Sequence, residues 1–232
     1  MTSNVTLFCL PFAGGSKYSL AYLKKVLPKN ISCNFLEYPG RGTRIREDFA
    51  ENISEVVDDI YQKIAPFLGK PYAIYGHSMG AKIAYLLTLR IREEGKKLPL
   101  HLFISGTDAP SVPLRKSPKH LLPKEEFVSA IKELGGLPDE ILANEEMLEY
   151  FEPILRADFR ISESYQYQAT HPLEIPLTVM VGDKEDMQEE DILEWQSETV
   201  FPINLYKFPG NHFFILNNER QIGKIIEGAL SK

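Results

Sequence analysis

Residues 72–93 read YAIYGHSMGAKIAYLLTLRIRE, and this stretch decides the fold. It begins with a short apolar run typical of a buried strand, passes through a Gly-x-Ser-x-Gly turn, and continues over 81–93 as a helix. In this context the Ser takes a strained backbone conformation that projects its hydroxyl above the sheet, and side chains at the two glycines would collide with neighbouring backbone. The pattern alone is a weak signal, but between a strand and a helix it predicts that Ser78 is a nucleophile.

Short apolar runs alternate with helical patterns along most of the chain. Residues 53–64 and 222–229 repeat apolar side chains at helical spacing, and Asn218 with Gln221 resembles a capping box before the second of these helices. Strands are predicted at 5–10, 32–37, 72–75, 100–105, 177–181 and 203–208. Most of these runs are continuously apolar, as expected for strands buried on both faces of a parallel sheet. The alternation predicts an α/β fold with a mainly parallel sheet, as a single domain over residues 1–232.

One interval breaks this alternation. Residues 106–175 contain no strand candidate over roughly 70 residues, against about 30 for a whole strand–helix–strand unit. Helices are expected at 123–134, ended by two glycines, and from 144 to about 156, where Pro153 disturbs the pattern. Their many large apolar side chains must pack on each other, on the sheet edge or around a ligand. We interpret residues 110–172 as a helical lid over the carboxyl ends of the strands; an ordinary extra helical layer is the alternative.

Composition and charge exclude several classes of function. Lys and Arg number 26 against 32 Asp and Glu, and a chain of net charge −6 without a dense basic run is a poor candidate for binding nucleic acid.

Cys9 and Cys33 lie in predicted strands and are expected to be reduced core thiols. No basic leader and no apolar run of about 20 residues is found, which predicts a cytoplasmic protein that does not enter membranes. No metal-ligand spacing, phosphate-binding loop or dinucleotide fingerprint is present, so we expect no metal or other cofactor. We also expect a monomer.

A serine nucleophile requires a base and an acid that orients the base, in the chain order Ser, acid, His. Of the five histidines, only His212 follows the last predicted strand and precedes the last helix, and it is the candidate general base. The acid is expected after the strand at 177–181, where the chain reads Gly-Asp-Lys-Glu-Asp. The usual position, three residues after the glycine, holds Glu185, whereas Asp186 is the commoner residue type. Glu185 and Asp186 are therefore equal candidates, ahead of Asp183.

An oxyanion hole requires two backbone N–H groups. One is expected from Met79, which follows the nucleophile at the start of a helix, where the helix dipole favours negative charge. The other is expected from the loop after the first strand, which reads PFAGGS over 11–16 and whose glycines allow close approach to a substrate. Phe12 is the first choice for this second donor and Ala13 is the next.

Two groups of basic residues remain. Arg41, Arg44 and Arg46 are expected on the surface of a loop, where they could meet an anionic arm of a substrate. A second group lies at the start of the expected lid: Arg115, Lys116, Lys119, His120 and Lys124. This second group could attract a phosphate or an acidic partner, and a solvated charged face is the equally weighted alternative.

The ordered set of motifs resembles the type II thioesterases, the discrete α/β-hydrolases that accompany nonribosomal peptide and polyketide synthases. The resemblance runs nearly end to end. Its motifs are LPFAGG at 10–15, YPGRG at 38–42, GHSMG at 76–80, LGGLP at 134–138, RADFR at 156–160, Trp195, and GNHF at 210–213. The chain departs from the family pattern in the acid loop, where Glu185 stands in the position that usually holds Asp.

The resemblance implies a hydrolase that removes stalled or misprimed acyl groups from the phosphopantetheine arm of an acyl or peptidyl carrier protein. Arg115, Lys116 and Lys119 are then candidate contacts to the carrier or its arm, at the entry of an acyl pocket walled by a mobile lid. A general carboxylesterase or lipase with the same triad is an alternative and would cleave p-nitrophenyl esters faster than carrier-bound thioesters. A binding protein without catalysis is a second alternative, and Ser78 would then resist a fluorophosphonate probe.

Overall fold

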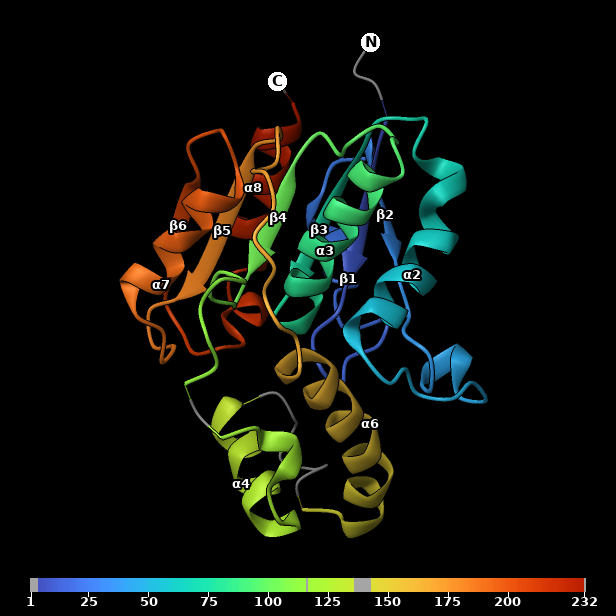
Figure 1. Ribbon diagram of the computed structural model, residues 1–232, viewed down its shortest axis with the longest axis vertical. Coiled ribbons are helices and arrows are strands. Elements are labelled where there is room, and N and C mark those ends of the chain that lie inside the picture. Colours follow the sequence, from blue (N-terminus) through green and yellow to red (C-terminus); the bar gives the residue numbers. More distant parts are fainter. Residues whose placement is uncertain (1–3, 116, 136–142, 232) are drawn as a thin grey trace.

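The computed structural model describes residues 4–115, 117–135 and 143–231, within which six strands form one sheet (Figure 1). Neighbouring strands are parallel throughout, in the order β2-β1-β3-β4-β5-β6. The strands are β1 (Val5–Leu10), β2 (Ile31–Phe35), β3 (Tyr72–His77), β4 (Leu102–Ser105), β5 (Leu177–Gly182) and β6 (Asn204–Phe208). All six overlap the predicted apolar runs, which confirms the α/β fold with a parallel sheet.

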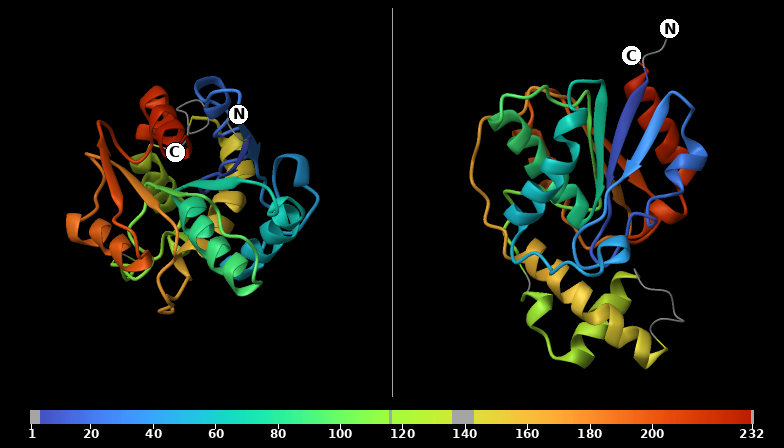
Figure 2. Two further views of the ribbon diagram at one scale, coloured as in Figure 1. Left: turned by 90° about the horizontal axis from the view of Figure 1, so that it is seen from above. Right: turned by 90° about the vertical axis from the view of Figure 1, so that its right-hand side faces the viewer.

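Helices cover both faces of this sheet (Figure 2). The α-helices are α1 (Leu23–Val26), α2 (Ile53–Ile64), α3 (Met79–Glu93), α4 (Lys124–Leu134), α6 (Glu145–Glu163), α7 (Glu189–Leu193) and α8 (Glu219–Leu230). Short 3-10 turns are η1 (Gly42–Arg44), η2 (Ala65–Phe67), η3 (Lys119–Leu121), η4 (Glu194–Glu198) and η5 (Phe214–Leu216). The apolar stripes of α2 and α3 pack on one face of the sheet, while α1 and α8 pack on the other, so the core has two layers.

The start of α8 differs from the expectation in one detail. The helix begins directly after Asn218, as predicted, but the Asn218 side chain does not cap it. Its amide instead donates to the carbonyl oxygens of Pro209, at 3.1 Å, and Phe214, at 2.9 Å. The predicted capping box is therefore wrong, because the Asn218 side chain is oriented toward the loop that precedes the helix.

The order of the strands places two loops at the centre of one edge of the sheet. β1 pairs with β2 on one side and with β3 on the other, so the chain reverses its direction of winding after β2. At such a reversal, the loops that leave the carboxyl ends of the two central strands diverge and open a crevice between them. The loops that follow β1 and β3 are the predicted oxyanion loop and the predicted nucleophile turn.

The segment interpreted as a lid, residues 110–172, supplies α4 and α6, which lie beyond the carboxyl ends of the strands (Figure 1). Helix α4 ends at Gly135 in the left-handed conformation, with φ of 77°, as the two glycines predicted. Helix α6 is longer than expected and runs through Pro153 to Glu163. Pro153 is exposed, so water can satisfy the carbonyl left without a donor, and the buried C-terminal half of the helix offsets the lost bond.

No helix in the described part of the chain is long and apolar enough to cross a membrane.

Candidate active site

The backbone at Ser78 has the strained conformation that the sequence predicted. Ser78 has φ of 56° and is the one non-glycine residue with positive φ among those that the structure describes. A Cβ atom on Gly76 would lie 2.1 Å from the carbonyl oxygen of Gly80, and a Cβ atom on Gly80 would lie 2.2 Å from that of Leu10. Real side chains do not fit at either place, so the two glycines permit the sharp turn from β3 into α3.

His212 and Glu185 form a hydrogen-bonded pair at the same edge of the sheet. Nδ1 of His212 lies 2.6 Å from Oε1 of Glu185, and Oε2 of Glu185 accepts a hydrogen bond of 2.7 Å from the N–H of Gly182. The carboxylate is only 4 % exposed, which strengthens its interaction with the imidazole. The sequence left the acid open between Glu185 and Asp186, and the geometry favours Glu185.

Asp183, the remaining acidic candidate of the loop, joins the loop after β5 to the loop after β6, which carries His212. Its N–H donates to the carbonyl of Phe208 at 2.7 Å, and its Oδ1 accepts from the N–H of Gly210 at 2.9 Å. The N–H of Lys184 donates to the carbonyl of Gly210 at 3.0 Å. These bonds fix the loop after β5 against the loop after β6, which holds Glu185 and His212 in register.

Ser78 and His212 line one cavity of about 180 Å³. The lining residues are Phe12, Ala13, Gly14, Ser78, Lys119, Ile131, Leu134, Leu155, Phe159, His212 and Phe213. The loop after β1 contributes one wall, and α4 and α6 contribute an opposite wall of apolar side chains. The cavity thus joins the serine and histidine to a surface that suits a hydrocarbon chain.

The N–H groups predicted for the oxyanion hole come from two elements. Met79 is the first residue of α3, and the first amides of a helix have no acceptor within it. Phe12 and Ala13 belong to the loop after β1 and line the cavity. Among the described residues, the backbone hydrogen bonds of loops and turns include none donated by the N–H of Phe12 or of Ala13.

His77 is buried directly beneath the histidine of the candidate site. Its ring centroid lies 5.0 Å from that of His212, and its Nδ1 lies 2.9 Å from Oγ of Ser105. Burial, and secondarily the charge of His212, lowers the pKa of His77 well below its ordinary value, so this ring stays neutral. A neutral neighbour adds no repulsion when His212 becomes an imidazolium.

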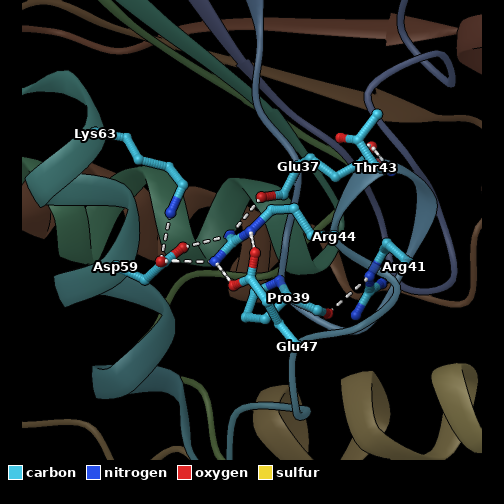
Figure 3. Close-up of polar contacts among 8 residues, drawn as sticks. All are labelled: Glu37, Pro39, Arg41, Thr43, Arg44, Glu47, Asp59 and Lys63. Atoms are coloured by element: carbon cyan, nitrogen blue, oxygen red, sulfur yellow. Dashed lines mark hydrogen bonds and ion pairs between the residues drawn. The ribbon is translucent and has the colours of Figure 1, made fainter.

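The expectation that three arginines lie on a loop surface is wrong for two of them. Arg41 is buried and forms a two-pronged ion pair with Asp158 of α6, so it is not available to a substrate. Arg44 is half-buried and bonds Asp59 of α2 at 2.7 and 2.9 Å (Figure 3). Arg46 is exposed, as expected.

The basic residues 115–124 also differ from one another in their surroundings. Arg115 pairs with Asp191 at 2.7 Å, while Lys119 lines the cavity with its ammonium 5.7 Å from the ring centroid of Phe159. Lys116 lies outside the described residues. Among the described residues of this group, Lys119 is therefore the one that lines the cavity.

Sequence reasoning did not single out Asp158, which accepts a hydrogen bond from the N–H of Gly14 in the loop after β1. Asp158 is completely buried on the core-facing side of α6, between Ile154 and Ile161 in the helical repeat. A carboxylate on the apolar stripe of a helix requires a buried partner, because an unpaired charge there is strongly unfavourable. A carboxylate on the apolar face of this helix was therefore the signal in the sequence that a buried cationic partner exists.

The parallel sheet, the strained serine and the histidine–carboxylate pair define an α/β-hydrolase, a class whose chemistry is centred on such a serine. A family model described as a thioesterase domain matches residues 5–230. The chain therefore belongs to the thioesterase family, hydrolases that act on thioester bonds, and the resemblance seen in its motifs is confirmed.

Individual relatives agree over nearly the whole chain. The gramicidin S biosynthesis protein GrsT of Aneurinibacillus migulanus is 35 % identical over 221 residues, covering 95 % of this chain and 86 % of that protein. The crystal structure of ClbQ from the colibactin NRPS/PKS pathway superposes with a TM-score of 0.93 at 33 % identity, covering 98 % and 97 % of the two chains. The type II thioesterase BorB from the borrelidin biosynthetic cluster gives a TM-score of 0.90 at 30 % identity, covering 99 % and 94 %.

Proposed function

We propose that this protein hydrolyses acyl thioesters on the phosphopantetheine arms of carrier proteins, with Ser78, His212 and Glu185 as its catalytic triad. The observation that carries the proposal is a single cavity in which Ser78 and the Glu185-bound His212 face an apolar wall from α4 and α6. The pathway contexts of GrsT, ClbQ and BorB support a carrier-bound acyl group as the substrate.

The triad performs the first half of the reaction. Nε2 of His212 takes the proton from the Ser78 hydroxyl as its oxygen attacks the thioester carbonyl. Glu185 stabilises the imidazolium and fixes the tautomer through Nδ1–H. The tetrahedral intermediate collapses and breaks the C–S bond, and the imidazolium returns the proton to the departing pantetheine sulfur. The acyl group is left as an ester on Ser78.

Water completes the cycle. His212 removes a proton from a water molecule, whose oxygen attacks the acyl-serine ester, and then returns a proton to the Ser78 oxygen as the ester bond breaks. The products are the free carboxylic acid and the restored serine. In both halves, the N–H groups of Met79 and Phe12 hold the negative oxygen, with Ala13 as the alternative to Phe12. A thiol has a pKa of about 8.5, so its departure requires little assistance.

The lid segment and its basic residues complete the proposal. Residues 110–172 form a mobile lid within the single domain and wall the acyl cavity, while Lys119, with Arg115 and Lys116 nearby in the chain, meets the carrier or its arm. Carrier proteins are usually acidic, so positive charge at the entry speeds their encounter. We further propose that the protein acts as a cytoplasmic monomer.

Hydrolysis of three substrates tests the proposed function. The same acyl group is offered on a phosphopantetheinylated carrier protein, on N-acetylcysteamine, and as a p-nitrophenyl ester. The proposal expects the largest kcat/KM for the carrier and labelling of Ser78 by a fluorophosphonate probe. Faster turnover of the p-nitrophenyl ester than of the carrier would instead support a general esterase, and an unlabelled Ser78 would rule out serine catalysis.

A further inference from the structure

The lid helix α6 directly contacts the loop that holds the proposed oxyanion donors. Oδ2 of Asp158 accepts a hydrogen bond of 2.7 Å from the N–H of Gly14, two residues after Phe12. Both carboxylate oxygens of Asp158 also pair with the guanidinium of Arg41, one of them at 2.6 Å. Asp158 is completely buried and Arg41 is 4 % exposed, so water does not compete for these bonds.

The same loop has little freedom elsewhere. The hydroxyl of Tyr38 donates to the carbonyl of Pro11 at 3.0 Å, and Glu37 accepts a hydrogen bond of 2.8 Å from the N–H of Lys17. A Cβ atom on Gly14 would lie 2.5 Å from Cδ2 of Leu155, so α6 packs directly on the backbone of the loop. The loop after β1 is thus held at both ends by the segment 37–41 and in its middle by α6.

The segment that carries Arg41 is itself anchored to the sheet domain (Figure 3). Arg44 pairs with Asp59 of α2, which also pairs with Lys63, and donates to the carbonyl of Glu37 at 2.9 Å. Burial alone would lower the pKa of Arg41, but the hydrogen bonds and charge of Asp158 raise it above its ordinary value, so the guanidinium stays charged. Arg41 therefore fixes Asp158, and Asp158 fixes Gly14.

We propose that Asp158 and Arg41 are positioning residues for the oxyanion hole, through which docking of α6 sets the location of the Phe12 and Ala13 amides. The inference rests on the proposed function, because it assigns a role in the same reaction. A displacement of about 1 Å in a preorganised donor is enough to reduce a rate roughly a hundredfold. A lid that lifts Asp158 away from Gly14 would then weaken oxyanion binding even with the triad intact.

The test removes the acceptor without leaving a buried charge. In the double variant Arg41→Met/Asp158→Leu, apolar groups of similar length replace the ion pair, and such replacements are commonly neutral for stability. Thermal unfolding should stay near the wild type, while kcat for the acyl-carrier substrate falls roughly ten- to a hundredfold and KM changes little. The pH dependence of kcat/KM should keep its shape, because His212 and Glu185 are held by other loops.

A transition-state analogue gives the decisive measurement. A trifluoromethyl ketone with the same acyl chain adds the Ser78 oxygen to its carbonyl and places an oxyanion in the hole. Its inhibition constant should weaken by the same factor as kcat/KM, while binding of the corresponding simple amide is unchanged. Wild-type kcat in a folded double variant, or a loss confined to KM, would overturn the inference. Should that variant fail to fold, Arg41→Met/Asp158→Ala, which also removes the acceptor without leaving a buried charge, is held to the same measurements.

A matched control separates positioning from general loosening of the lid. Nζ of Lys82 on α3 donates to the carbonyl of Ser162 near the end of α6 at 3.0 Å, and no hydrogen bond among the described residues joins Lys82 to the loop after β1. Lys82→Met should leave kcat and the affinity of the trifluoromethyl ketone within about threefold of the wild type. Equal losses in Lys82→Met and in the double variant would contradict the specific role of Asp158. Fluorophosphonate labelling of wild-type Ser78 checks the proposed function separately.

Discussion

The two sides of Ser78 are held in place by different means. On the His212 side, Asp183 and Lys184 bond the loop after β5 to the loop after the adjacent strand β6, so neighbouring loops of the sheet fix the geometry. On the oxyanion side, the loop after β1 is held by side chains from distant segments, including Asp158, 144 residues further along the chain. The side of the general base is therefore held by neighbouring loops of the sheet, whereas the side of the predicted oxyanion hole is held by the segment 37–41 and by α6.

The largest expected effect comes from removing either central triad member. Ser78→Ala and His212→Ala should each lower kcat by several orders of magnitude, because triad members act as a unit, and the double variant should be little worse than either. Circular dichroism should show an unchanged fold, since both side chains are partly exposed at the cavity. Near-wild-type turnover in either variant would contradict the mechanism.

The next effect separates the two acidic candidates on the base side. Glu185→Gln removes the acceptor that holds the Nδ1–H tautomer and should reduce kcat by up to about 10⁴. Asp186→Asn is the matched control in the adjacent position and should stay within about tenfold of the wild type. Steady-state kinetics on the acyl-carrier substrate measures both, and a severe loss only in Asp186→Asn would reverse the assignment.

A smaller effect concerns charge at the cavity. Lys119→Glu should lower kcat/KM for the acyl-carrier substrate about three- to tenfold at low salt, and the deficit should shrink as salt screens the attraction. The same acyl group on N-acetylcysteamine should be affected less. Lys124→Glu, an exposed position on α4 that does not line the cavity, is the control. Equal losses on both substrates would show that Lys119 shapes the cavity rather than meeting the carrier.

The smallest expected effect is on the stability of the folded protein. It concerns Asp108, a partly buried carboxyl that interacts electrostatically with Glu185. Burial, with the charges of Asp191 and Glu185, raises the pKa of Asp108 to about 6, against the opposing charges of Arg115 and Lys82. The folded protein thus keeps a proton that the unfolded chain loses near pH 3.8, so the stability that this proton contributes at low pH is lost as the pH rises through about 6.

Asp108→Asn should therefore raise the free energy of unfolding at pH 8 by about 1–2 kcal/mol, a value already reduced because the residue is only partly buried. At pH 4 the variant and the wild type should differ little, since both are then neutral at this position. Urea unfolding at the two pH values measures the difference. An equal gain at both would show that titration of Asp108 is not its cause.

Much of the molecule was predictable because its signals are local. The apolar runs gave all six described strands, and the turn around Ser78 follows from steric limits that two glycines relieve within five residues. His212 followed from chain order, because the carboxyl ends of parallel strands meet at one edge of the sheet. Helix α6 was predicted too short, since Pro153 is a local signal and the burial that carries the helix past it is not.

The sequence by itself determined the fold class, the nucleophile and base candidates, and the family. Only the tertiary structure decided which acid contacts His212. Glu185 and Asp186 are adjacent carboxylates in the same loop, and no sequence pattern distinguishes which of them points at the imidazole. Only the tertiary structure showed that Arg41 forms an ion pair with Asp158 and that Asp158 accepts a hydrogen bond from Gly14. Local patterns record which face of an element is apolar, but a buried ion pair is chosen by which segments meet in space, and that is fixed by the packing of the whole chain.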